Sequence, residues 1–405
     1  MIRACLALLL VAQAQPPDYR GSYTVPIGDA ALGYPGPGKD DPIARLQARL
    51  DSGAVKLEWD EKHGYLPAVL KALKIPVSSQ GLVFSKTSFQ APLISPAAPR
   101  AIYFSDSVYV GFVPKGPVLE LSAADPARGG FFYTLEQKRV AKPQIERGEG
   151  CLSCHVSPNT TGVPGHLVRS VYPDATGFPL GTVGSFVTDH RSPFAERWGG
   201  WYVTGTHGNA RHMGNVVVKD QSKPEALDRE AGANVTSLQG LVDTRPYLSP
   251  HSDIVALMVL EHETKMHNLF TRAGYEVRAA QTLQGEMNKA LGRPAEEISE
   301  STARRIENAA EILVRYLLFL DEPRLESPVR GTSGFAREFA ARGGLREFDL
   351  ETRLFKYRCS FLIGSESFRA LPDALRARVW ARIDGVMAGA EWAATREVLA
   401  ATVRR

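Results

Sequence analysis

The chain has 405 residues, of which 44% are hydrophobic and 23% charged, with a formal net charge of +4 and four cysteines. This length and apolar content suffice for one large or two ordinary domains, whose core needs no disulfide framework. The net charge is small and the sequence has no run of basic residues, so nucleic acid is not implied as a partner.

The first 14 residues have the pattern of a secretory signal peptide. Arg3 gives a positive start, residues 6–11 form a short apolar run, and Ala12-Gln13-Ala14 is a small-x-small cleavage pattern. Cys5 is expected to leave with this peptide. Every apolar run falls short of the ~20 residues that a membrane span needs. We therefore predict a periplasmic or otherwise exported protein without a membrane span.

Residues 15–41 are rich in Pro and Gly and predict an arm laid over the surface. Residues 42–143 form a β-rich region that opens with two short helices, at 42–50 and 66–73. Runs of β-branched and aromatic residues then predict an antiparallel meander, at 82–84, 101–104, 108–113, 118–121 and 131–134. We expect this sheet to cover one face of the site described next, with a separate domain as the alternative.

The most informative stretch is Cys151-Leu152-Ser153-Cys154-His155. Two cysteines three apart, followed at once by a histidine, meet the requirements for covalent attachment of a c-type haem. Each thiol adds to a vinyl group of the porphyrin, and the imidazole reaches the iron as proximal ligand. We predict one covalent haem c, held by Cys151, Cys154 and His155.

A CxxC pair has three other common uses. A structural zinc site needs two further ligands from a second knuckle, and the only other mature cysteine, Cys359, stands alone. A dithiol redox centre normally follows a buried strand, whereas residues 146–150 are polar and Gly-rich. A simple disulfide is the third alternative. Cys359 itself is expected to be a small core residue.

The predicted haem-binding region spans 144–250 and contains four of the nine histidines, together with candidates for the sixth iron ligand. Met213 follows His155 by 58 residues, close to the spacing in small soluble cytochromes c, and is the first choice. His212, His207 and His190 are alternatives, as is His262 from the helix that follows. Each of these histidines could instead be a satisfied loop or core residue.

Residues 251–405 are predicted to be helical. Apolar periodicity indicates long helices at 252–282 and 295–320, and two more at 371–387 and 391–403. A loop with one short helix is expected at 331–344, and a buried segment of uncertain type at 348–370. The sequence thus predicts an α+β protein built around one haem. It consists either of the regions 42–143, 144–250 and 251–405 or of one continuous domain from 42 to 405.

The chain resembles a group of large exported bacterial proteins. The resemblance rests on the haem motif, the stretches 184–193, 197–207 and 257–268, and Leu354-Phe355-Lys356-Tyr357. These proteins carry one CxxCH and are described only as cytochrome c domain proteins. The resemblance covers most of residues 40–390, and it implies defined roles only for Cys151, Cys154 and His155. The chain is several hundred residues longer than an ordinary small cytochrome c, which puts simple electron shuttling in doubt.

Two functions are consistent with these features. The first is electron transfer by a monohaem c-type cytochrome, with a redox partner protein that the sequence does not identify. The second is a peroxidase-like haem oxidoreductase acting on a small exported substrate, with an open sixth site served by His190, Arg191 or His207. A haem-bearing sensor or scaffold is a third possibility.

Overall fold

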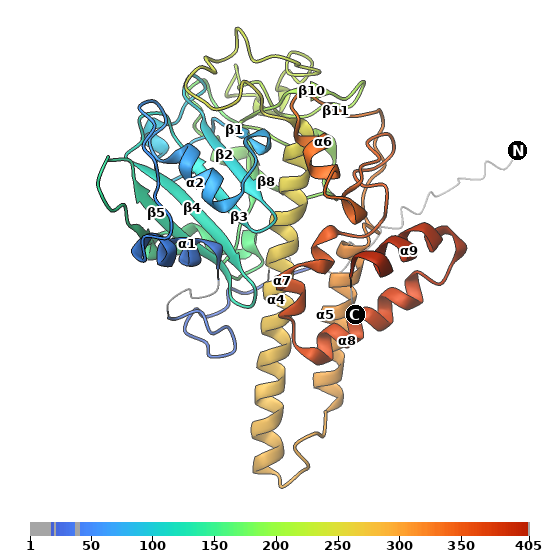
Figure 1. Cartoon of the computed structure of the whole chain (residues 1–405). Helices are drawn as coiled ribbons and strands as arrows, with labels where there is room; N and C mark the ends of the chain where they lie inside the picture. The colour runs from blue at the N-terminus through green and yellow to red at the C-terminus, as the bar shows by residue number, and fades with distance from the viewer. Residues whose placement is uncertain (1–17, 20–21, 37–40, 404–405) are drawn as a thin grey trace, which may run out of the picture.

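The computed structural model describes residues 18–19, 22–36 and 41–403. It has an antiparallel sheet in the N-terminal part and helices in the C-terminal part, so the predicted α+β class is confirmed (Figure 1). The predicted signal peptide lies outside the described residues.

A seven-stranded sheet organises the N-terminal part, in the order β6-β5-β4-β3-β2-β1-β9. Strands β1 to β5 are the five runs of the predicted meander, β6 continues it, and the two-residue strand β9 joins the edge beside β1. The bounds are β1 Gly81–Val83, β2 Arg100–Ser105, β3 Val108–Phe112, β4 Val118–Asp125, β5 Gly129–Glu136, β6 Ile145–Arg147 and β9 Trp201–Tyr202.

The two faces of this sheet have different neighbours. Side chains alternate along a strand, so Leu119, Leu121 and Ala123 of β4 share one face, where they enter a core with α1 (Pro42–Asp51) and α2 (Leu66–Leu73). Glu120 and Ser122 share the opposite face. That second face is turned toward the CxxCH segment and the long helix α4.

Helix α4, Ile254–Ala290, is the central element of the C-terminal part. Asp253 caps it, because its Oδ1 accepts hydrogen bonds from the backbone N–H groups of Val255 and Ala256. Every residue from 254 to 273 is buried, so this half is enclosed by protein on all sides. The remaining half projects from the body with α5, Glu300–Leu317, as an antiparallel hairpin (Figure 1).

The other predicted helices also form, with shorter ends. They are α6 Phe335–Ala340, α8 Asp373–Val386 and α9 Ala393–Thr402, and the segment of uncertain type contains α7, Glu366–Arg369. Further short strands, outside the main sheet, are β7 Val168–Val171 with β8 Ser185–Thr188 and β10 Gly205–Thr206 with β11 Arg330–Gly331.

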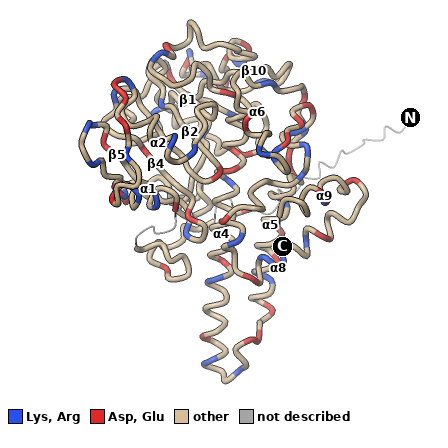
Figure 2. Tube along the Cα trace, in the orientation of Figure 1, with Lys and Arg blue, Asp and Glu red and all other residues tan. Residues whose placement is uncertain are grey.

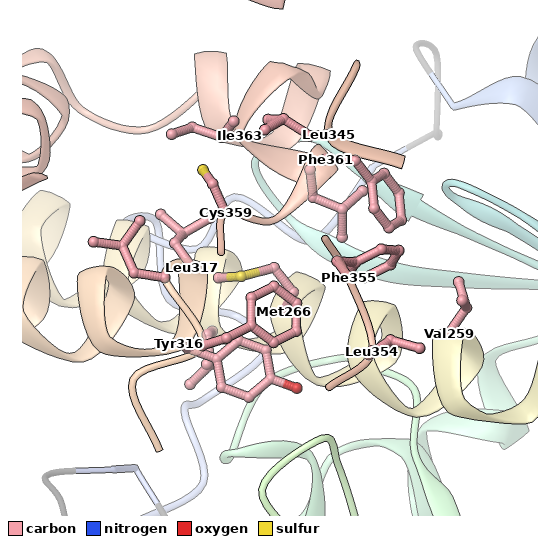
Figure 3. Packing of buried hydrophobic residues seen from close by; sticks show 14 of the residues in the cluster. Val259, Met266, Tyr316, Leu317, Leu345, Leu354, Phe355, Cys359, Phe361 and Ile363 are labelled. Carbon is pink, nitrogen blue, oxygen red and sulfur yellow. The ribbon is translucent and has the colours of Figure 1, made fainter. Parts of the chain in front are cut away.

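One hydrophobic cluster runs from Val83 and Phe104 on the sheet through α4 to Leu399 near the C-terminus. Figure 3 shows part of it, where Met266 of α4 and Tyr316 of α5 lie near Cys359. Cys359 is fully buried, as predicted for a core residue. The sheet and the helices therefore share this core.

The Pro- and Gly-rich arm is packed more tightly than predicted. Its side chains Val25, Leu32 and Tyr34 are at most 3% exposed. The Tyr34 hydroxyl donates to the carbonyl of Gly130, and the Val25 N–H donates to that of Gly162. The arm therefore contributes to the core beside β5 instead of only covering it.

Acidic and basic residues are interspersed along the chain, including the projecting hairpin (Figure 2). Over the described ranges, the helices are too short or too polar to cross a lipid bilayer.

Candidate functional site

The CxxCH motif forms one turn of helix at the surface, α3 (Leu152–His155). The Ser153 hydroxyl donates to the Gly150 carbonyl at 2.8 Å and secures the start of this turn. Cys151 is partly exposed, Cys154 is exposed, and both are free thiols. Cys151 precedes Cys154 by three residues and His155 by four, the spacings that place residues on one side of a helical turn.

The His155 ring has a fixed orientation. Its Nδ1 lies 2.9 Å from the carbonyl oxygen of Gly165, which can only accept, so Nδ1 carries the proton and Nε2 has the free lone pair. Burial lowers the pKa of His155, which favours the neutral imidazole that binds metals. This is the arrangement in which metal-binding histidines are commonly held.

The second face of the sheet, which carries Glu120 and Ser122, packs against this site. The Phe132 ring of β5 lies 4.4 Å from the His155 ring, centre to centre. Arg100 and Glu120 form an ion pair of 2.6 Å nearby, and Glu120 also accepts hydrogen bonds from Ser88 and Gln90. Burial raises the pKa of the Cys151 thiol, and the Glu120 carboxylate adds to this effect. The thiol therefore stays protonated at neutral pH.

His166 is a neighbour of His155 that the sequence did not single out as such. The two rings lie 6.4 Å apart, and His166 also packs against Tyr109 of β3 at 4.4 Å. Its Nε2 lies 3.0 Å from the Ser122 hydroxyl. The only signal in the sequence was its place in the Gly- and Pro-containing turn that follows the motif.

Met213 lies in a small hydrophobic cluster of its own. It is fully buried with Tyr172, Val218 and Leu227, and its sulfur lies 3.7 Å from the Ser170 hydroxyl, which donates to it. Met213 therefore has apolar neighbours and a hydrogen-bond donor of its own, and its assignment as sixth ligand stays a prediction.

His207 and His212 form a pair of their own, with ring centres 4.7 Å apart. His207 Nδ1 lies 2.8 Å from the Ala210 carbonyl, and its Nε2 accepts the Asn234 N–H at 3.0 Å. His212 Nδ1 accepts the Gly214 N–H at 3.0 Å. Both histidines have the contacts of structural loop residues.

His190 and His262 are brought together in the interior. Their Nδ1 atoms lie 2.8 Å apart, and His262 Nε2 lies 2.8 Å from the Ser360 hydroxyl. The rings of Tyr316 and Phe319 pack on both histidines. Burial lowers the pKa of each, so both are neutral and one donates to the other.

The donor set of the motif fits a covalently attached haem. Two free thiols at the surface and one imidazole with an available Nε2 are the groups that such a haem uses. Within the part of the chain that the structure describes, no three His, Cys, Asp or Glu side chains gather in a group suited to a bare metal ion.

Comparisons with known proteins add no relative: no family model matches the chain, and neither a curated protein nor a solved structure is significantly similar to it. The resemblance to cytochrome c domain proteins therefore stays a prediction.

Proposed function

We propose that this protein is an exported monohaem c-type cytochrome that transfers electrons through one covalently attached haem. The observation that carries the proposal is the His155 ring, whose Nδ1 is tied to the Gly165 carbonyl while two free thiols share the same helical turn. A haem bound there supplies a one-electron carrier.

The residues of the chain have distinct tasks in this proposal. Cys151 and Cys154 would hold a haem through thioether bonds, and His155 would offer Nε2 to its iron. Phe132 supports the imidazole from the sheet, and the Arg100–Glu120 pair supplies charges of opposite sign beside it. Because the motif lies at the surface, a redox partner reaches the haem edge without opening the protein.

The second candidate is a peroxidase-like haem oxidoreductase with an open sixth position. The contacts of the five candidate sixth ligands favour it. Met213 and the four histidines each already have a hydrogen-bond partner within the protein, which argues against their binding iron. An iron with a free sixth position can bind a small substrate directly.

Covalent attachment is the first prediction to test. The full-length gene is expressed with a bacterial c-type haem maturation system, and the mature protein is analysed by mass spectrometry and by extraction with acidified organic solvent. The wild type is expected to gain the mass of one haem and to keep its colour on extraction, whereas Cys151→Ala/Cys154→Ala loses both. Cys359→Ala is the matched control and keeps the haem, because this thiol lies in the core. A colourless wild type refutes the proposal.

The spectrum of the ferric protein separates the two candidates. Low-spin iron with two protein ligands supports electron transfer, and a methionine-to-iron charge-transfer band that disappears in Met213→Ala assigns the sixth ligand to Met213. High-spin iron that binds cyanide readily supports the enzyme instead. An unchanged spectrum in Met213→Ala removes Met213 from the iron.

A further inference from the structure

The carbonyl that orients His155 belongs to a loop held by the central helix. Asn268 of α4 binds this loop at two points: its Oδ1 accepts the backbone N–H of His166 at 3.0 Å, and its Nδ2 donates to the carbonyl of His166 at 2.6 Å. Asn268 is 2% exposed. It lies in the half of α4 in which every residue is buried, so the anchor itself is enclosed by protein.

The loop closes back onto the haem motif through Gly165. The N–H of Gly165 donates to the His155 carbonyl at 3.0 Å, while the carbonyl of Gly165 accepts from His155 Nδ1 at 2.9 Å. A Cβ at position 165 would lie 2.1 Å from Asn268 Oδ1, so only glycine lets the amide approach this closely. The Asn268 amide, the loop and the His155 ring form one continuous hydrogen-bonded unit.

We propose that Asn268 is a positioning residue for the iron ligand: through the Gly165–His166 segment it fixes the direction and the tautomer of His155. The inference rests on the proposed function, because it assigns His155 to iron. A histidine ligand whose second nitrogen donates to a fixed carbonyl is held in place and made more basic, and loss of such a partner typically lowers metal affinity about 10- to 100-fold.

Removing the Asn268 amide leaves the N–H and the carbonyl of His166 without their buried partners. The peptide group between Gly165 and His166 then has no hydrogen bond to Asn268. The carbonyl of Gly165 is therefore no longer fixed at hydrogen-bonding distance from His155 Nδ1. The thioether bonds do not depend on this contact. Haem attachment should therefore survive while the bond between His155 and iron weakens.

The test measures the pH at which acid displaces His155 from the iron, followed by the absorption spectrum of the haem-loaded full chain. Asn268→Ala is expected to raise this midpoint by about one to two pH units. Protons compete with iron for His155 Nε2, so a 10- to 100-fold loss of iron affinity lets protons displace the iron at a proton concentration about 10- to 100-fold lower. Asn268→Leu fills the same space without hydrogen bonds and is expected to act alike if the alanine variant fails to fold. The charged and titratable groups that act on His155, namely Arg100, Glu120 and His166, are the same in all variants.

The matched control is Asn288→Ala. Asn288 is also a buried asparagine of α4 that binds backbone carbonyls, but at the tip of the projecting hairpin. Its removal is expected to leave the acid midpoint unchanged. If Asn268 variants retain covalent haem with an unshifted midpoint, or if Asn288→Ala shifts it equally, the positioning role is refuted while the proposed function stands. If the wild type carries no covalent haem, both fall.

Discussion

Glu263 is a buried acid at the centre of the molecule. It lies on α4 with 1% of its surface exposed, next to the hydroxyl of Tyr109. Burial raises its pKa well above the ordinary value of 4.5, and the nearby Asp106 adds to this effect. The group therefore keeps its proton in the folded protein at pH values where the unfolded chain has lost it.

Replacing Glu263 by glutamine is expected to change the pH dependence of stability. A raised pKa in the folded state contributes stability that is complete below pH 4.5 and is lost as the pH rises toward the folded value. Glutamine is neutral throughout, so the free energy of unfolding of Glu263→Gln should rise relative to that of the wild type between pH 4.5 and neutral pH. Urea titrations at several pH values measure this. Glu286→Gln, an exposed position on the same helix, is the control, and parallel curves for Glu263→Gln would contradict the prediction.

At the scale of elements, the projecting hairpin of α4 and α5 is held at its tip by polar side chains. Gln284 donates to Asn288 at 2.7 Å and accepts from the Thr302 hydroxyl at 2.9 Å. Asn288 donates to the carbonyls of Pro294 and Glu297 in the connecting turn. These bonds tie the connecting turn to α4 where little apolar packing is available.

The hairpin is expected to open independently of the rest of α4. Asn288→Ala removes the hydrogen bonds to the turn, and a typical intramolecular hydrogen bond contributes about 0.5 to 1.5 kcal/mol. Amide hydrogen exchange should therefore speed up between residues 277 and 305 and stay unchanged between 254 and 273, where the helix is enclosed. Uniform acceleration along the whole helix would show instead that α4 opens as one unit.

Periodicity predicted the longer elements, because a buried face leaves a repeat in the sequence. Helix α2 begins and ends as expected, and the five runs of the meander became β1 to β5. The two-residue strand β9 has no period to detect, and its place beside β1 is decided by tertiary packing. Helix α4 extended to Ala290, beyond the predicted end, because α5 covers one side of the added turns.

The site was predictable only where it is local. Covalent chemistry fixes the spacing of Cys151, Cys154 and His155, so the motif is visible in five consecutive residues. Phe132, Gly165 and Asn268 reach it from three other segments. The sheet was expected to cover the site, but no pattern in the sequence indicates which of its side chains does so, or that Gly165 and Asn268 join it. The contacts of Met213 and of the His190–His262 pair depend in the same way on the folded chain.

At the scale of the whole molecule, buried titratable groups predict how the fold responds to acid. Burial lowers the pKa of the interior histidines His166, His190, His212, His262 and His267. Burial raises the pKa of Glu261 and Glu322 to about 7, as it raises that of Glu263. The two sets have opposite effects between pH 4.5 and 6.5, since the unfolded chain binds more protons on histidine and the folded chain more on glutamate.

Five histidines outweigh three glutamates in that interval, so stability is expected to fall gradually as the pH drops from 6.5 to 4.5 and steeply below pH 4.5. Below pH 4.5 the glutamates are protonated in both the folded and the unfolded state. Histidines whose folded pKa is about 3, such as His212 and His262, are protonated in the unfolded chain but still neutral in the folded one, so acid favours unfolding. Asp189, whose pKa is strongly lowered by its bonds to Arg191 despite burial, adds to the loss. Thermal unfolding across this range measures the effect, and a constant melting temperature below pH 4.5 would contradict it.

The loop from Gly162 to His166 is pinned between the sheet and α4, and it carries the Gly165 carbonyl to His155. The CxxCH peptide therefore cannot be excised as a minimal unit with this contact intact. Any shortened version that is to hold His155 as the full chain does must keep β5 and the first half of α4, although more than a hundred residues separate them in the sequence.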